Sequence, residues 1–202
     1  MSNLEDKIHA PSCERNRAPL LQSLKGLLDS TSGTLLEIGS GTGQHAVYFA
    51  PALPRLNWQP TDLADNLKNI ECWRCESGIT NISPAIKLDV AHHPWPINEA
   101  QAVFTANTLH IVAWPLVIDF FEGVSQVLCK DSLCIVYGPF NYQGDFTSAS
   151  NKDFDAWLKA RDANSGIRDF EAVNELAASK QLVLVQDVAM PANNRLLVWQ
   201  KK

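Results

Sequence analysis

A short stretch of acid and glycines stands where the chain could hold a cofactor. Residues 37–43 follow the pattern E-x-G-x-G-x-G, and Glu37 stands two places before the first of three alternating glycines. Apolar residues precede this stretch, and residues 44–50 have the composition of a helix. Glycine reaches positive φ and lets the backbone approach a ligand, and a helix N-terminus offers unpaired N–H groups. A strand, a glycine turn and a helix in this order indicate a nucleotide-cofactor site.

The spacing of the glycines separates the kinds of nucleotide site. A dinucleotide fingerprint reads G-x-G-x-x-G. Gly39 and Gly41 fit it, but Gly43 comes one place early and Gln44 occupies the third glycine position. A phosphate-binding P-loop requires G-x-x-x-x-G-K-[ST], and the turn contains no lysine. The spacing therefore disfavours both a nicotinamide-dependent oxidoreductase and a P-loop enzyme.

Composition limits the class of protein. The chain has 202 residues, of which 46% are hydrophobic and 19% charged, which suits one folded domain over residues 1–202. The net charge is −5, and basic residues gather only at Arg15 and Arg17 and at Lys201-Lys202, which disfavours broad nucleic-acid binding. The polar, acidic residues 1–6 do not resemble a signal peptide. No run approaches the roughly 18 apolar residues of a membrane helix, so a cytoplasmic protein is expected.

The cysteines do not predict a disulfide framework or a metal site. Their number is five, and Cys72-Trp73-Arg74-Cys75 forms the C-x-x-C pair. A redox dithiol would open a helix, whereas this pair falls late in a helix expected to begin near Leu63. A zinc site would need a second pair of ligands, which the chain lacks. We therefore expect buried or half-buried structural thiols and no metal.

Strands and helices alternate along the chain. Apolar runs predict strands at residues 35–38, 56–61, 85–88, 102–106, 133–137, 182–188 and 196–199. Helical spacing predicts helices at residues 18–29, 44–53, from about 63, from Pro115, 152–161 and 169–179, with a loop at residues 138–150. This alternation is typical of a parallel sheet with helices on both faces, and in such sheets ligands bind at the carboxyl ends of the strands.

Polar residues follow the predicted strands. Asp62 ends the second strand, 19 residues after Gly43, where an acid can bind ribose hydroxyls; it could also cap the next helix. Asp89 ends the third strand and Asn107 the fourth, although each could simply satisfy backbone groups. His110 is a candidate general base because histidine titrates near neutrality, and a half-buried structural histidine is the alternative.

The turn resembles the first motif of the class I S-adenosylmethionine (SAM) methyltransferases. In that family the acid helps to place the methionine end of the cofactor, an acid at the position of Asp89 accepts from the adenine amino group, Val90 would pack on the ring, and the position of Asn107 faces the methyl group. The resemblance implies a Rossmann-like, seven-stranded, mostly parallel sheet with an antiparallel last strand. The implied cofactor-binding residues are Glu37, Gly39, Ser40, Gly41, Gly43, Asp62, Leu63, Asp89, Val90 and Asn107.

One family signature is missing from the fourth strand end. Ala106-Asn107-Thr108-Leu109-His110 is not the Asn/Asp-Pro-Pro-aromatic motif of methyltransferases that act on amide or exocyclic base nitrogens, so those acceptors are disfavoured.

Nearly the whole chain also resembles a small family of uncharacterised methyltransferase-like proteins, catalogued as a domain of unknown function. The resemblance is carried by residues 14–17, the glycine turn, and residues 107–110, 151, 154–155, 161–162, 166–169 and 190–194. It implies the fold and a SAM site, and it implies no substrate.

Polar segments outside the turn are candidates for a lid or a substrate site. Residues 1–17 could fold over the cofactor, with Arg15 or Arg17 pairing with its carboxylate or with an anionic acceptor; solvated loops are the alternative. The candidate lid or substrate residues are Arg15, Asn16, Arg17, Asn141, Asn193 and Asn194.

The sequence thus predicts a SAM-dependent methyltransferase with a small-molecule acceptor. A SAM-binding protein without catalysis is the first alternative, because methyl transfer needs no fixed catalytic residue. An NAD-dependent oxidoreductase is the second. Asn107 and His110 are weak catalytic candidates, and the acceptor and the oligomeric state are not predicted.

Overall fold

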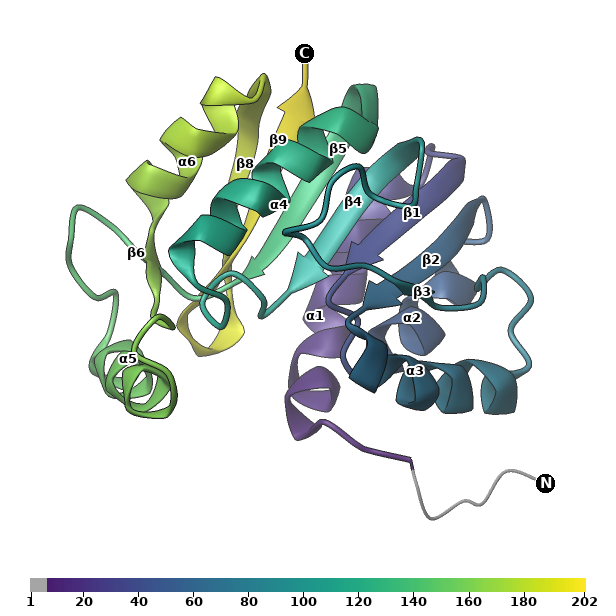
Figure 1. Ribbon diagram of the computed structural model, residues 1–202, viewed down its shortest axis with the longest axis horizontal. Helices are drawn as coiled ribbons and strands as arrows, with labels where there is room; N and C mark the ends of the chain where they lie inside the picture. The colour runs from purple at the N-terminus through teal and green to yellow at the C-terminus, as the bar shows by residue number, and fades with distance from the viewer. Residues whose placement is uncertain (1–6) are drawn as a thin grey trace. The chain divides into compact units, whose positions relative to one another are not determined.

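The computed structural model describes residues 7–202 and contains a seven-stranded sheet in the order β3-β2-β1-β4-β5-β9-β8 (Figure 1). Its strands are β1 (Gly33–Ile38), β2 (Leu56–Asp62), β3 (Ile86–Lys87), β4 (Ala100–Ala106), β5 (Leu128–Gly138), β8 (Leu182–Met190) and β9 (Asn194–Lys201). β1 pairs in parallel with β2 and β4, and β2 with β3. β9 runs antiparallel to both β5 and β8. The predicted fold class and the antiparallel last strand are confirmed.

Six α-helices connect the strands of the described chain. They are α1 (Pro11–Leu28), α2 (Gln44–Phe49), α3 (Ala64–Ser77), α4 (Trp114–Val127), α5 (Ala149–Arg161) and α6 (Phe170–Ser179). Two short 3-10 turns add η2 (Ala50–Ala52) and η3 (Pro191–Asn193). No helix within residues 7–202 is long and apolar enough to cross a membrane.

Several predicted boundaries were wrong, including those of the first and fifth helices and of the loop after β5. α1 begins at Pro11 rather than at residue 18, because a proline at the first helical position is already set for the helix. α5 begins at Ala149 rather than 152, because the Ser148 side chain accepts from the Asn151 N–H and caps the helix. The predicted loop at 138–150 contains a short strand, β6 (Phe140–Asn141), which pairs in parallel with β7 (Arg168–Asp169).

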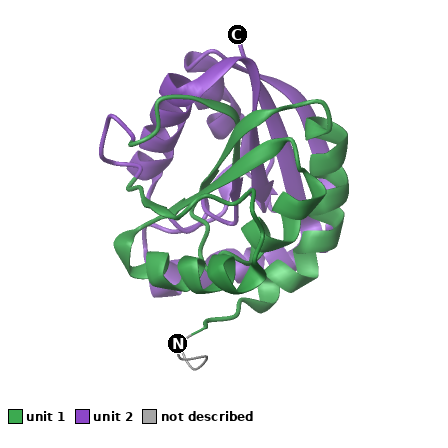
Figure 2. Cartoon of the chain, turned by 90° about the vertical axis from the view of Figure 1, so that its right-hand side faces the viewer, with its two compact units in different colours: residues 1–89, 96–104 green, residues 90–95, 105–202 purple. Residues whose placement is uncertain are grey.

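The chain divides into two compact units, which Figure 2 colours green and purple. The first comprises Met1–Asp89 and Pro96–Phe104, of which residues 1–6 lie outside the described part. Its core is aromatic: the Phe49 ring lies 5.7 Å from Trp58 and 5.9 Å from Phe104, and Trp58 lies 6.0 Å from Phe104. Leu20 and Leu24 on α1 are fully buried, as the helical spacing predicts.

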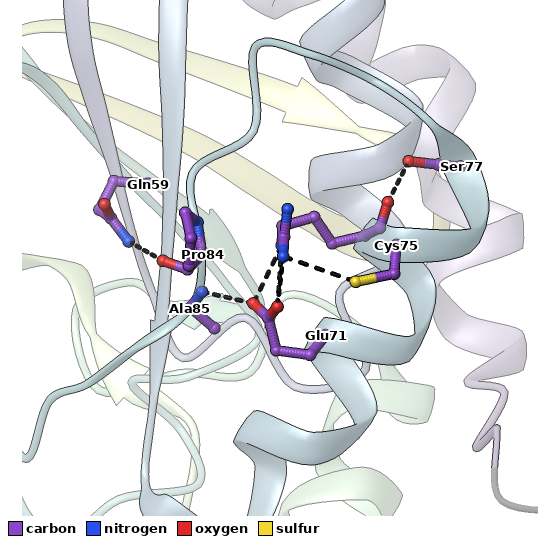
Figure 3. A network of polar contacts seen from close by, with 7 residues as sticks. Gln59, Glu71, Cys75, Ser77, Pro84 and Ala85 are labelled. Carbon is purple, nitrogen blue, oxygen red and sulfur yellow. Dashed lines mark hydrogen bonds and ion pairs between the residues drawn. The ribbon is translucent and has the colours of Figure 1, made fainter. Parts of the chain in front are cut away.

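A polar network on α3 holds the segment that leads into β3 (Figure 3). Glu71 accepts from the Arg74 guanidinium at 2.6 Å and from the backbone N–H of Ala85 at 2.6 Å. Gln59 on β2 donates to the Pro84 carbonyl at 2.9 Å. These bonds attach residues 84–85 to α3 and β2, so the network fixes the approach to β3 and to Asp89 beyond it.

The second unit comprises Val90–Trp95 and Thr105–Lys202. In this unit α4 and α6 lie across β5, β9 and β8 (Figure 1). On β9 the Trp199 ring meets Phe121 of α4 edge-on at 5.6 Å, and its Nε1–H donates to Asn174 of α6 at 2.9 Å. The Trp199 ring thus has an aromatic contact to α4 and a hydrogen bond to α6, and together they hold both helices against β9.

Candidate functional site

The glycine turn joins β1 to α2 in left-handed backbone conformations. The φ angles are 69° at Gly39, 58° at Gly41 and 86° at Gly43. A Cβ at Gly43 would lie 3.0 Å from the Ile70 backbone, whereas a Cβ at Gly41 would meet nothing within 4 Å. Gly43 is thus required for packing against α3, and Gly41 faces open space where a ligand could pass close to the backbone.

Glu37 lies buried beneath the turn. Its Oε2 accepts from Ser40 Oγ and from Trp58 Nε1, each at 2.9 Å. Burial raises the pKa of Glu37 to about 7, against the opposing effect of these two hydrogen bonds, and the charge of Asp62 raises it further. Glu37 therefore titrates close to neutral pH, where a cationic ligand group would favour its ionised form.

Asp62 connects the turn to the end of β2. Its Oδ2 accepts from the Gly41 N–H at 2.6 Å, and its Oδ1 accepts from the Leu63 N–H at 2.7 Å and from Asn66 Nδ2 at 2.8 Å. The N-cap of α3 is Leu63, without a side-chain bond, so the helix-cap alternative for Asp62 was wrong. A carboxylate oxygen with one bond retains acceptor capacity, so Asp62 can position Gly41 and still accept from a ligand.

The end of β3 reaches the same region of the first unit. Thr61 and Asp62 pair with Ile86 and Lys87, and the Leu88 N–H donates to the Asp62 carbonyl at 2.9 Å. Asp89 follows directly and is half-buried. The first unit therefore brings together Glu37, Ser40 and the glycines with Asp62, Leu63 and Asp89. Val90 begins the second unit.

Asn107 and His110 lie in the second unit, after β4. Asn107 has φ 59°, and its N–H donates to the Tyr137 carbonyl at 2.8 Å. His110 is 4% exposed and meets Phe154 edge-on at 5.4 Å. Burial lowers the pKa of His110 to about 4, and the charge of Arg168 adds to this. The expectation of a pKa near neutrality was wrong, because the imidazole is desolvated; His110 is uncharged at pH 7.

The predicted lid residues are helical. Arg15, Asn16 and Arg17 lie in α1 rather than in a loop before it. Asn16 is buried, with its Oδ1 2.7 Å from His45 Nε2 of α2, and Arg17 lies over the Tyr48 ring at 4.7 Å. Arg15 is exposed. α1 is thus fastened to α2, while residues 1–6 of the predicted lid lie outside the described residues.

Two residues next to the turn carry no predicted role. Gln44 is buried, and its Oε1 accepts from the Ala10 N–H at 2.6 Å and from Thr42 Oγ1 at 2.9 Å. Cys13 on α1 is half-buried near Glu37 and Thr42, and burial raises its thiol pKa, with Glu37 contributing. The Gln in place of the third glycine was the available signal for Gln44; no sequence signal placed Cys13 there.

The remaining candidate residues lie in the second unit at two places. Asn193 and Asn194 line a cleft of about 420 Å³ with Tyr142, Thr147, Ala189, Met190 and Arg195. Their side chains also bond locally: Asn193 Nδ2 donates to Ser150 Oγ at 3.2 Å, and Asn194 Nδ2 donates to the Pro191 carbonyl at 3.1 Å. Asn141 is buried on β6 and does not line this cleft.

None of the five cysteines forms a disulfide bond. Cys72 is half-buried as expected, but Cys75 is exposed, because it lies on the outer side of α3 beside Arg74. Within residues 7–202, no group of three or more His, Cys, Asp and Glu side chains is arranged to hold a metal ion.

The strand order, the antiparallel β9 and the glycine turn after β1 define the Rossmann-like methyltransferase fold. An O-methyltransferase family protein from Burkholderia thailandensis superposes with a TM-score of 0.79 at 12% identity, over 91% of this chain and 55% of that one. The SAM-dependent methyltransferase SibL in its apo form superposes with 0.78 at 16% identity, over 94% and 55%. An O-methyltransferase family 2 protein from Planctomyces limnophilus, in complex with apigenin, gives 0.76 at 15% identity, over 91% and 61%.

The chain spans between about half and two thirds of the length of these structures. A family model described as "Protein of unknown function (DUF938)" matches residues 7–201, and the chain belongs to this family.

Proposed function

We propose that the protein is a SAM-dependent methyltransferase that acts on a small molecule. The observation that carries the proposal is the geometry of the glycine turn. Asp62 fastens Gly41, the space beyond Gly41 is open, and the carboxyl group of Glu37 lies buried below. The shared fold with methyltransferase structures supports this assignment.

In this proposal each of the three acids binds a different part of the cofactor. Glu37 lies nearest the turn and faces the methionine end, whose ammonium group would favour the ionised carboxylate. Asp62 accepts from the ribose hydroxyls, and Asp89, past the end of β3, accepts from the adenine amino group. The cofactor supplies the reactive methyl group, and the chain supplies orientation and a water-poor pocket.

His110 is a poor proton acceptor in this mechanism. A general base works best when its pKa lies near the working pH, and burial holds the pKa of His110 at about 4. We therefore assign no general base, and expect an acceptor whose reacting atom is already nucleophilic at neutral pH. Asn107 remains a candidate for contact with the cofactor or the acceptor.

Calorimetric titration with SAM, S-adenosylhomocysteine (SAH) and NAD tests the cofactor. We expect micromolar binding of SAM and SAH and no binding of NAD, because the third glycine of the dinucleotide fingerprint is displaced. Binding of NAD alone would favour the oxidoreductase. If SAM binds and a metabolite extract never converts it to SAH, a non-catalytic SAM-binding protein is favoured.

A pair of glycine substitutions tests the site itself. Gly41→Ala places a methyl group in the open space at φ 58°, and Gly78→Ala does the same at φ 64° beyond the end of α3. Both should lower stability by about 1–2 kcal/mol, the cost of a left-handed alanine, measured by urea unfolding. Only Gly41→Ala should weaken SAH binding, by at least tenfold in calorimetry. Equal SAH affinity in the two variants would remove Gly41 from the site.

A further inference from the structure

Within residues 7–202, two buried side-chain oxygen atoms of the second unit have no hydrogen-bond donor. They are Oδ1 of Asn141 and Oδ1 of Asp169. Their residues are direct partners in the parallel pairing of β6 and β7. Asn141 is 7% exposed. Nearly all buried polar side-chain atoms in proteins have a partner, and an unpaired one destabilises the folded state. Two unpaired acceptors side by side therefore call for a functional explanation.

Asp169 does not make the helix-capping hydrogen bond that its position would allow. It occupies the N-cap of α6 in an extended conformation, where aspartate usually accepts from a backbone N–H of the first turn, but its side chain makes no such bond. The neighbouring Arg168 donates instead to the carbonyls of Leu109 at 2.9 Å and Asn164 at 3.0 Å, and also to that of Val112. Oδ1 of Asp169 is thus left without a donor from residues 7–202.

The two oxygens share one face of the strand pair. The residues that follow them, Tyr142 and Phe170, stack on each other with ring centroids 5.1 Å apart. Because successive side chains of an extended segment point to opposite faces, the register partners Asn141 and Asp169 lie on the face opposite to Phe140 and Arg168. The face of Asn141 and Asp169 is polar and already oriented by backbone pairing.

The β6–β7 strand pair lies beside the loop that carries Asn107 and His110. β6 begins two residues after β5 ends at Gly138, and a Cβ on Gly138 would lie 3.4 Å from His110 Nδ1. Arg168, whose side chain points to the opposite face of β7 from Asp169, binds the backbone of residues 109–112. The carboxyl ends of strands are where ligands bind in this class of sheet, and Asn141 lies three residues beyond the carboxyl end of β5.

We propose that Asn141 and Asp169 bind a protonated primary amino group of the methyl acceptor. This inference rests on the proposed methyl transfer. An ammonium group offers three donors and no acceptor, which matches two oxygens that lack donors, and its charge complements a carboxylate. One hydroxyl hydrogen would satisfy only one of the oxygens, and a carboxylate or phosphate would be repelled. The amino group is an anchor, because a protonated amine has no lone pair to receive the methyl group.

The substitution Asp169→Asn tests whether Oδ1 of Asn141 and Oδ1 of Asp169 lack hydrogen-bond donors. The new amide can donate to Asn141 Oδ1, so the unliganded variant should melt about 2–4 °C higher than the wild type, the shift that about 1 kcal/mol produces in a chain of this length. Asp153→Asn removes the same charge from an exposed position on α5 and should leave the melting temperature unchanged. A lower melting temperature for Asp169→Asn alone would show that Asp169 already has a donor, and would overturn the proposal.

Titration with methylammonium, followed by nuclear magnetic resonance of the ¹⁵N-labelled full chain, tests the ligand. The side-chain amide of Asn141 should shift saturably at millimolar concentrations, the affinity expected of so small a ligand. Tetramethylammonium carries the same charge without an N–H donor and should produce no saturable shift. Asp169→Asn should bind methylammonium at least tenfold more weakly. Equal shifts with both cations, or equal affinity in the variant, would overturn the amine site.

The same samples separate this inference from the proposed function. Methylammonium binding needs no cofactor, and SAH binding is measured by calorimetry without an amine. A wild-type protein that binds SAH but not methylammonium contradicts the amine anchor alone. A protein that binds methylammonium but neither SAM nor SAH contradicts methyl transfer, and with it the identity of the amine as an acceptor.

Discussion

At the scale of single residues, the protonation of Glu37 makes the free energy of unfolding depend on pH. Burial raises its pKa to about 7 from an ordinary 4.5. The folded protein therefore binds this proton more tightly than the unfolded chain does. The contribution of Glu37 to the free energy of unfolding falls as pH rises from about 4.5 to about 7, by about 3 kcal/mol in total.

Glu37→Gln should remove this dependence while it keeps an oxygen for Trp58 and Ser40. Urea unfolding of both proteins from pH 4.5 to 8 measures the difference. We expect the stability of the wild type relative to the variant to fall up to about pH 7 and then to level off. A constant difference across this range would mean that Glu37 is ionised throughout.

Asp62 allows a second test at this scale. Asp62→Asn keeps the shape of the side chain but weakens its charge-assisted hydrogen bonds, so SAH affinity should fall by about 1.5–3 kcal/mol. Asp65→Asn makes the same change at an exposed position three residues away and should have no effect. Calorimetry of the two folded variants decides, and an unchanged affinity for Asp62→Asn would exclude Asp62 from ribose binding.

The sequence predicted which residue types would form the candidate site, but it did not predict their hydrogen-bond partners. The glycine spacing and the acids at strand ends predicted which residues would gather in the first unit. Nothing local indicated that Asp62 would bond to the Gly41 N–H, or that His110 would be desolvated by Phe154 and its neighbours. Such contacts join residues far apart in the chain, and burial, which only the fold determines, sets the pKa values.

At the scale of elements, Glu71 should hold the segment before β3 against α3. Although partial burial opposes it, hydrogen bonds from Arg74 and the Ala85 N–H lower the pKa of Glu71. Its contribution to stability is therefore present above the ordinary pKa and is lost as pH falls through the lowered one. Because the Arg74 and Glu71 side chains are 24% and 33% exposed, their ion pair contributes only modestly to the free energy of unfolding.

Two substitutions at Glu71 separate hydrogen bonding from charge. Glu71→Gln keeps an oxygen for the Ala85 N–H, whereas Glu71→Ala removes it, at a cost of about 1 kcal/mol. Hydrogen exchange should show faster exchange of the Ala85 amide in Glu71→Ala and near-normal protection in Glu71→Gln. If the Ala85 amide is equally protected in both variants, Glu71 does not hold this segment.

Element types were predictable because hydrophobic spacing reports the buried face. The spacing of Val117, Phe120 and Val124 predicted α4, and all three are buried. Ends were missed where polar side chains decide them, as at Ser148 before α5. The β6–β7 pair escaped prediction because two-residue strands have no period, and their pairing depends on residues 28 positions apart.

At the scale of the whole molecule, the sheet order follows from the family fold, and the function does not. The alternation of strands and helices predicted a parallel sheet, and the resemblance added the antiparallel β9, which the structure confirms. The proposed amine site was beyond sequence reasoning, because it rests on polar atoms that the packing leaves without a donor. Asn141 was named as a candidate, but Asp169 as its partner was not.

The position of β9 between β5 and β8 also affects how the protein is made on the ribosome. β5 is an eleven-residue strand whose second half is buried and largely apolar, and it pairs with β9 over residues 133–138. During synthesis the ribosome must add the whole of α5, α6 and β8 before β9 can cover that edge. An uncovered apolar strand edge favours association with other chains. We therefore expect the nascent chain to associate with other chains most readily in the interval before the last strand emerges.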